Sequence, residues 1–136
     1  MHVSRVVFAG LAWLFVGLIV LQVFYAGVGL LGGGTMAEHR EFGYLVAMFP
    51  LLVLIAAAVS RAGRLAWWTA GLLLLAQVQT ILPWFAEDAP FVAALHPVNA
   101  LLLFWGGLTI ARRATAMARE RVEETAEASR PQPTAT

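Results

Sequence analysis

The sequence predicts an all-α integral membrane protein, a four-helix bundle that crosses the bilayer up-down-up-down. Two observations lead to this fold class. Of the 136 residues, 60% are hydrophobic and 12% are charged, whereas a soluble domain is about 45–50% apolar and about 25% charged. The apolar residues also form four stretches, each near the roughly 20 residues that cross a bilayer, and short polar or glycine-rich turns separate them.

The boundaries of the first two helices follow from local signals. The first helix is expected over about residues 6–31. A cleaved signal peptide is the alternative, but the apolar run is too long for one and no Ala-x-Ala site closes it. Gly32–Gly34 ends this helix. The second helix is expected over about 36–60, because Thr35 and Glu38 have the spacing of a capping box.

The third helix is expected over about 65–85, with tryptophans at both ends, as in the aromatic belts of membrane proteins. The fourth is expected over about 90–111, with a kink at Pro97. Residues 1–112 would then form the bundle. Residues 113–136 alternate charge with alanine and end in a Pro/Thr-rich segment, which predicts a charged, frayed helical extension in the cytoplasm that passes into a disordered tail.

The basic residues, all arginines, are unevenly distributed between the two sides of the bundle. Arg40 lies on one side with four acidic residues, and on the other side lie Arg5, Arg61, Arg64, Arg112, Arg113, Arg119 and Arg121. The positive-inside rule therefore puts both termini in the cytoplasm of a multi-pass plasma membrane protein, as in a bacterial inner membrane. The lipid bilayer is the expected partner, and a net charge of +1 gives no indication of nucleic-acid binding.

Polar side chains gather at one depth of the predicted bundle. At about 1.5 Å per helical residue, counting from the cytoplasmic arginines puts four of them about 20–25 Å away, in the outer part of a hydrocarbon core about 30 Å thick. These four are Gln22, Gln79, His96 and Asn99. His39 comes out at about 31 Å by the same count. The cytoplasmic half of the bundle offers almost no polar side chain.

A faint repeat relates the two helix pairs. Gln22 precedes His39 by 17 residues, and Gln79 precedes His96 by the same 17. Each pair thus has a glutamine near the outer end of one helix and a histidine at the start of the next. An ionisable side chain beside a membrane-length apolar run is costly unless it has a partner or a function, so the two histidines are the main chemical lead.

One interpretation of the histidine pair is a bis-histidine haem site. Gly43 and Ala100 follow the two histidines by four residues and share a helix face with them, where a flat ligand needs a small residue. Two such histidines at similar depth suit bis-histidine haem ligation, with Arg40 near a propionate. In the alternative, the histidines are interfacial, the amide side chains join helices, and the small residues serve packing alone.

Some segments resemble a known family. His39-Arg40-Glu41-Phe42-Gly43 is similar to the His-Arg-x-x-Gly/Ala segment that opens the second helix of each half of heme A synthase. Leu21-Gln22-Val23 resembles the Leu-Gln run of that family's preceding helix. Residues 79–102, with Ala94-Leu95-His96 and Asn99-Ala100, look like its third and fourth helices. The resemblance covers about residues 15–112, one four-helix half of the eight-helix protein.

The resemblance implies a haem b site with His39 and His96 as axial ligands. It does not imply the synthase reaction, because that family works on haem with two halves and this chain has one. The chain also lacks the cysteine pair of some members, and Pro97 directly follows the histidine. The segment 95–102 is also similar to small uncharacterised bacterial four-helix membrane proteins, a resemblance that implies no activity.

Three functions follow as hypotheses. The first is a haem b protein that carries electrons or handles haem near the outer face. The second is a structural or accessory subunit, without cofactor, that packs against a membrane complex or a second copy. A transporter or quinone-binding protein is third, although no acidic residue lies within an apolar stretch. The chain has no cysteine for a thiolate or iron–sulfur site, and no residue is assigned a catalytic role because no nucleophile–base pair is placed for hydrolysis.

Overall fold

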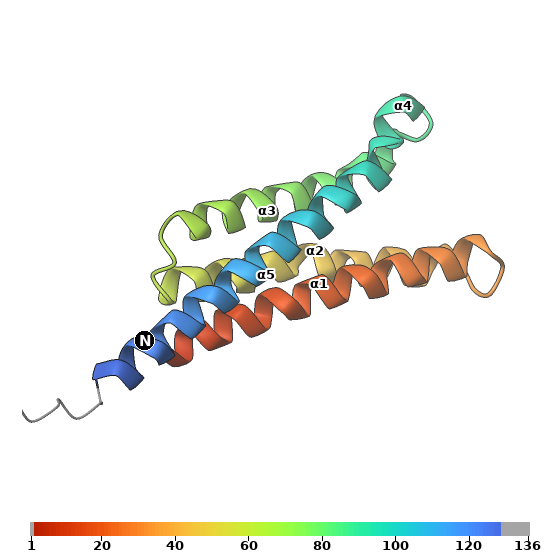
Figure 1. Ribbon diagram of the computed structural model, residues 1–136. Helices are drawn as coiled ribbons and strands as arrows, with labels where there is room; N and C mark the ends of the chain where they lie inside the picture. Colours follow the sequence, from red (N-terminus) through yellow and green to blue (C-terminus); the bar gives the residue numbers. More distant parts are fainter. Residues whose placement is uncertain (1, 129–136) are drawn as a thin grey trace, which may run out of the picture.

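The computed structural model describes the backbone of residues 2–128 and the side chains of residues 2–120. Within these residues the protein is all α-helical, as predicted. The order of elements along the chain is α1 (His2–Leu30), α2 (Met36–Val59), α3 (Arg64–Ile81), the 3₁₀ helix η1 (Leu82–Phe85), α4 (Pro90–Ala93) and α5 (Leu95–Ala128) (Figure 1).

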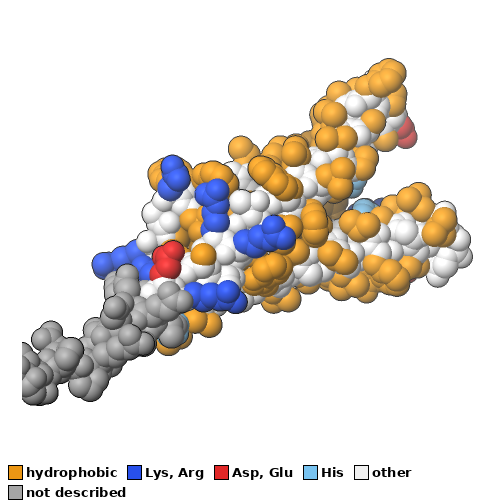
Figure 2. All heavy atoms as spheres, in the orientation of Figure 1, with side chains coloured by type: hydrophobic (Ala, Val, Ile, Leu, Met, Phe, Trp, Pro, Cys, Tyr) orange, Lys and Arg blue, Asp and Glu red, His pale blue; other side chains and the backbone are white. Residues whose placement is uncertain are grey.

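Four stretches of the described chain are long and apolar enough to cross a membrane: His2–Leu30, Met36–Val59, Arg64–Phe85 and Pro90–Glu120. Only 17–33% of the most apolar window in each is buried inside the protein. Apolar side chains therefore cover most of the outer surface of these helices (Figure 2). Such a surface suits lipid rather than water, so the chain is a small multi-pass membrane protein.

The first three helices lie close to their predicted bounds. Helix α1 starts four residues earlier than expected, and α2 starts at the predicted Met36. Thr35 caps α2, since its hydroxyl accepts from the Ala37 backbone N–H at 3.2 Å and donates to a Glu38 carboxylate oxygen at 2.6 Å. Glu38 thus meets the cap residue, as the capping-box spacing indicates.

The prediction of a single fourth helix with a kink at Pro97 was wrong. Helix α4 ends at Ala93, and α5 begins at Leu95. Pro97 is the third residue of α5, where a backbone N–H has no partner inside the helix, so a proline there costs no hydrogen bond. The chain therefore breaks just before His96, and Pro97 belongs to the first turn of a new helix.

Helix α5 continues to Ala128, so the predicted helical extension beyond residue 112 is continuous with the fourth apolar helix. The expected boundary at 112 is therefore not the end of an element. The predicted disordered tail falls partly on residues 129–136, which lie outside the described part of the chain. The first described turns of this extension pack against α1, since Ala111, Ala114 and Ala118 are buried.

The core lies in the half of the bundle that carries most of the arginines. Phe8 and Phe15 of α1 meet the buried alanines of α5 and Val53 of α2 there. Gly107 lets α5 approach α1, because a Cβ at this position would lie 3.2 Å from the Phe15 ring. Beyond this core the helices diverge in two pairs (Figure 1).

The two diverging ends form two limbs. The first limb, residues 22–43, is the end of α1 with the start of α2, and the second limb, residues 79–100, runs from the end of α3 to the start of α5. A notch separates the limbs in the space-filling view (Figure 2). This notch places the predicted polar layer at the bottom of an opening between two helix hairpins.

Candidate functional site: a histidine pair between two hairpins

In the first limb, Gln22 and His39 hold α1 and α2 together. The Nδ1 atom of His39 lies 3.1 Å from the backbone carbonyl oxygen of Gln22. In return, the Gln22 side-chain Nε2 donates to the His39 carbonyl oxygen at 2.7 Å and lies 3.0 Å from His39 Nδ1. Both residues are half-buried. The histidine is therefore positioned by the helix before it.

Gly43 makes this contact possible. A Cβ at Gly43 would lie 2.7 Å from the Gln22 Nε2 atom, so a larger residue would displace the amide. The sequence suggested that a small residue here leaves space for a flat ligand. The structure gives Gly43 the packing role of the alternative interpretation, with Gln22 of the preceding helix as the neighbour that the sequence did not identify.

In the second limb, His96 is held in the same way. Its Nδ1 atom lies 3.0 Å from the backbone carbonyl oxygen of Gln79, and its Nε2 lies 3.2 Å from the Gln79 side-chain Nε2. The buried Asn99 extends this network, since its Nδ2 donates to Gln79 Oε1 at 2.7 Å and to the Leu75 carbonyl oxygen at 2.9 Å. Asn99 therefore joins α5 to α3.

The 17-residue repeat in the sequence thus corresponds to a repeated contact. In each limb a histidine Nδ1 faces the backbone carbonyl of the glutamine 17 residues earlier. A carbonyl accepts only, so Nδ1 carries the proton in this contact, and the lone pair of each ring is at Nε2. Hydrogen-bonding one ring nitrogen to a carbonyl is how proteins usually orient a metal-ligating histidine.

The two histidine rings meet across the notch. Their centroids are 6.2 Å apart and their planes are 73° from parallel. Histidine side chains appear on both facing sides of the notch in the space-filling view (Figure 2). The predicted pair is thus brought together from two hairpins that are far apart in sequence.

The other predicted residues are placed differently. Ala100 is half-buried on α5, and Arg40 is exposed. Arg5, one starting point of the depth count, donates from Nη1 to the carbonyl oxygen of Met117 at 3.2 Å, five residues beyond Arg112.

Sequence reasoning missed a hydrogen bond that joins the two hairpins below the limbs. Gln77 Nε2 donates to the Ala47 carbonyl oxygen at 3.0 Å and so joins α3 to α2. Gln77 and Gln79 are two residues apart and therefore point to different faces of one helix. That spacing could have indicated that Gln79 contacts the histidine and that Gln77 faces a neighbouring helix.

The chemistry available at this site is limited to a few donor atoms. Among the described residues no group of three or more His, Cys, Asp or Glu side chains is arranged to hold a metal ion. Two imidazoles alone complete the shell of a metal only when another molecule supplies the other ligands. The iron of a haem meets this condition, since the macrocycle occupies its equatorial positions and protein ligands take the axial ones.

The comparisons with known proteins add one match. Residues 22–86 are similar to a family of unknown function (DUF6220), a stretch just under half of the chain. It begins at Gln22, includes His39 and Gln79, and ends before His96. No curated protein and no solved structure matches the chain.

Proposed function

We propose that this membrane protein binds haem b in the notch between its limbs, with His39 and His96 as axial ligands. The spacing of the rings carries the proposal. With metal–nitrogen bonds of about 2.0 Å and about 1.1 Å from nitrogen to ring centre, two opposed imidazoles have centres about 6.2 Å apart. The two rings here are 6.2 Å apart.

The residues around the histidines suit a ligand role. The backbone carbonyls of Gln22 and Gln79 accept from the two Nδ1–H groups and leave the Nε2 lone pairs for a metal. Binding would require the Gln79 amide to move from its position 3.2 Å from His96 Nε2, and the Gln22 amide to move from its position 3.4 Å from His39 Nε2. A glutamine side chain has several rotatable bonds, so no backbone change is needed, but moving the Gln79 amide costs its bond to His96 Nε2 and the bond that it accepts from Asn99.

Haem held by two histidines supplies one-electron chemistry, which suits an electron carrier or a haem-handling protein. The resemblance to one half of heme A synthase supports the same ligand pair. The arginine distribution would place the site near the outer face of a plasma membrane, with both termini in the cytoplasm. Arg40, exposed beside His39 in sequence, is a suitable partner for a propionate there.

An absorption spectrum tests the proposal. The full chain is expressed with haem available and purified in mild detergent, and we expect a Soret band with the split visible bands of a bis-histidine haem. His39→Ala and His96→Ala should each abolish that spectrum. His2→Ala is the matched control, because His2 is exposed at the start of α1, and it should retain the spectrum.

Two results would overturn this function. One is a purified wild-type protein without a Soret band. The other is a band that survives intact in one of the two histidine variants, because bis-histidine ligation needs both rings.

The second candidate is an accessory subunit without cofactor. It is favoured by one observation: Gln79 and Asn99 already satisfy the polar atoms around His96 by hydrogen bonds, as expected of side chains that only join helices. This function predicts co-purification with a membrane protein partner, or with a second copy, and no chromophore. The spectrum described above separates the two candidates.

A further inference from the structure

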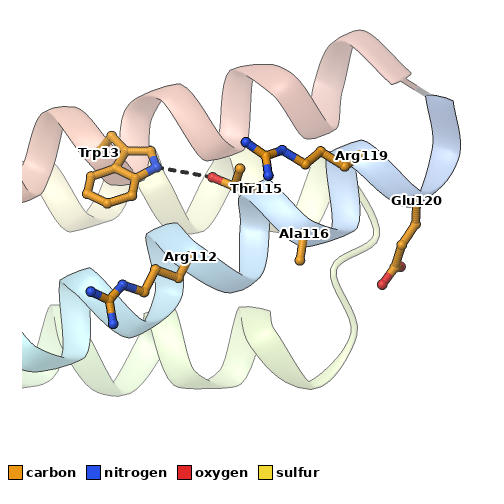
Figure 3. A pocket seen from close by; sticks show the side chains of 6 residues that line it. All are labelled: Trp13, Arg112, Thr115, Ala116, Arg119 and Glu120. Carbon is orange, nitrogen blue, oxygen red and sulfur yellow. Dashed lines mark hydrogen bonds between the residues drawn. The ribbon is translucent and has the colours of Figure 1, made fainter. Parts of the chain in front are cut away.

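The arginine-rich end of the bundle has a pocket that the proposed haem site does not use. Its volume is about 410 Å³. It lies between α1 and α5, and its lining is Trp13, Arg112, Thr115, Ala116, Arg119 and Glu120 (Figure 3). Two arginines and one carboxylate give the lining a net positive charge.

One face of α5 forms the floor of this pocket. Residues 112, 115, 116 and 119 have the i, i+3, i+4, i+7 spacing of a single helix face. Trp13 forms the wall, and its indole N–H donates to the Thr115 hydroxyl at 3.1 Å (Figure 3). The same hydroxyl donates to the Ala111 carbonyl oxygen at 2.8 Å. The indole and the hydroxyl are therefore engaged, and the guanidinium groups remain for a ligand.

The two arginines point toward the membrane part of α5. Helical side chains tilt toward the N-terminus of their helix, and both Arg112 and Arg119 extend from α5 in that direction (Figure 3). For α5 the N-terminal direction leads into the apolar stretch. A guanidinium directed toward the bilayer is one that an anion at the membrane boundary would stabilise.

We propose that this pocket binds the phosphate headgroup of an anionic phospholipid in the leaflet on the arginine-rich side. Tryptophan is typical of the headgroup level, and Trp13 is 44% exposed. Leu14, the next residue, is 51% exposed and offers apolar surface to an acyl chain. The carboxylate of Glu120 disfavours a ligand that carries more negative charge than a phospholipid headgroup. The pocket still attracts an anion, because one carboxylate does not cancel two guanidinium groups. This inference is independent of the haem site.

Lipid retention measures the proposal directly. The full chain is reconstituted into bilayers of equal parts phosphatidylglycerol and phosphatidylcholine and then extracted in mild detergent. Native mass spectrometry of the intact protein identifies the lipids that remain bound. We expect phosphatidylglycerol to be enriched. Arg112→Gln and Arg119→Gln should each lower this enrichment about fivefold, the effect of one basic residue at an anionic surface. Glu120→Gln should raise it.

Arg61→Gln is the matched control, because Arg61 carries the same charge in the α2–α3 turn and lines no part of this pocket. It should leave the enrichment within twofold of wild type. An equal loss for Arg61→Gln, or an unchanged enrichment in both Arg112→Gln and Arg119→Gln, would overturn the proposal. If inorganic phosphate displaces the lipid at millimolar concentration, the pocket is a free-anion site and the lipid assignment fails.

Should the arginine variants not fold, Glu120→Gln and Arg61→Gln decide the question. Glu120 is an exposed residue of the same pocket, so its replacement tests the electrostatics without disturbing the core. No gain in phosphatidylglycerol from Glu120→Gln would then count against the headgroup site.

Discussion

Gly43→Ala tests whether the Gln22–His39 contact organises the first limb. The added Cβ would lie 2.7 Å from Gln22 Nε2, so the amide must turn away and lose its bond to the His39 carbonyl oxygen, now 2.7 Å long. That loss is worth about 0.5–1.5 kcal/mol. Replacing a helical glycine by alanine gains about 0.8–1.0 kcal/mol. The two effects nearly cancel, and we expect the unfolding free energy to change by less than about 1 kcal/mol.

A double-mutant cycle separates the two effects. In a Gln22→Ala background the steric conflict is gone, so Gly43→Ala should stabilise the protein by about 0.8–1.0 kcal/mol. Gly71→Ala is the control, because a Cβ at Gly71 has no atom within 4 Å, and it should stabilise both backgrounds equally. The measurement is reversible unfolding in mixed detergent micelles, followed by circular dichroism. An equal effect of Gly43→Ala in both backgrounds would refute the reasoning.

Two further predictions concern the core and the topology. Phe15 is 1% exposed and stacks on Phe49 at 6.3 Å, so Phe15→Ala should destabilise by about 3–5 kcal/mol, while Leu14→Ala, at an exposed neighbour, should change stability by less than about 0.5 kcal/mol; similar losses for both would contradict the core assignment. The chain has no cysteine, so Glu87→Cys should react with a membrane-impermeant maleimide in intact cells and Arg61→Cys only after lysis. The reverse labelling pattern would show that the termini are outside.

Much of the fold could be predicted because the signals were local. The apolar runs predicted the four membrane-length helices, and Thr35 predicted the start of α2 at Met36. The prediction missed the break before α5, because it placed the bend of the chain at Pro97. A proline in a first helical turn costs no hydrogen bond, and the sequence alone did not reveal that a turn at Ala94 had already ended the preceding helix.

The candidate site was predicted in part. The shared 17-residue spacing identified His39 and His96 as a pair, because it places each histidine beside the glutamine of the preceding helix. Their approach to 6.2 Å depends on how the two hairpins cross, which no local pattern encodes. The neighbour of Gly43 and the bond from Gln77 were equally out of reach, because each depends on a partner in another helix.

The limbs have a mechanical consequence for the histidine pair. The described hydrogen bonds of His39 and His96 stay within one limb each, so none of them fixes the distance between the rings. That distance is set by the contacts between the hairpins below the notch, where Gln77 bonds to the Ala47 carbonyl oxygen and Gly107 meets Phe15. From Gly107 to His96, α5 acts as a lever about 16 Å long, and a tilt of about 5° moves its tip by about 1.4 Å. Substitutions in the apolar core can thus tune the gap between two ligands that they never touch.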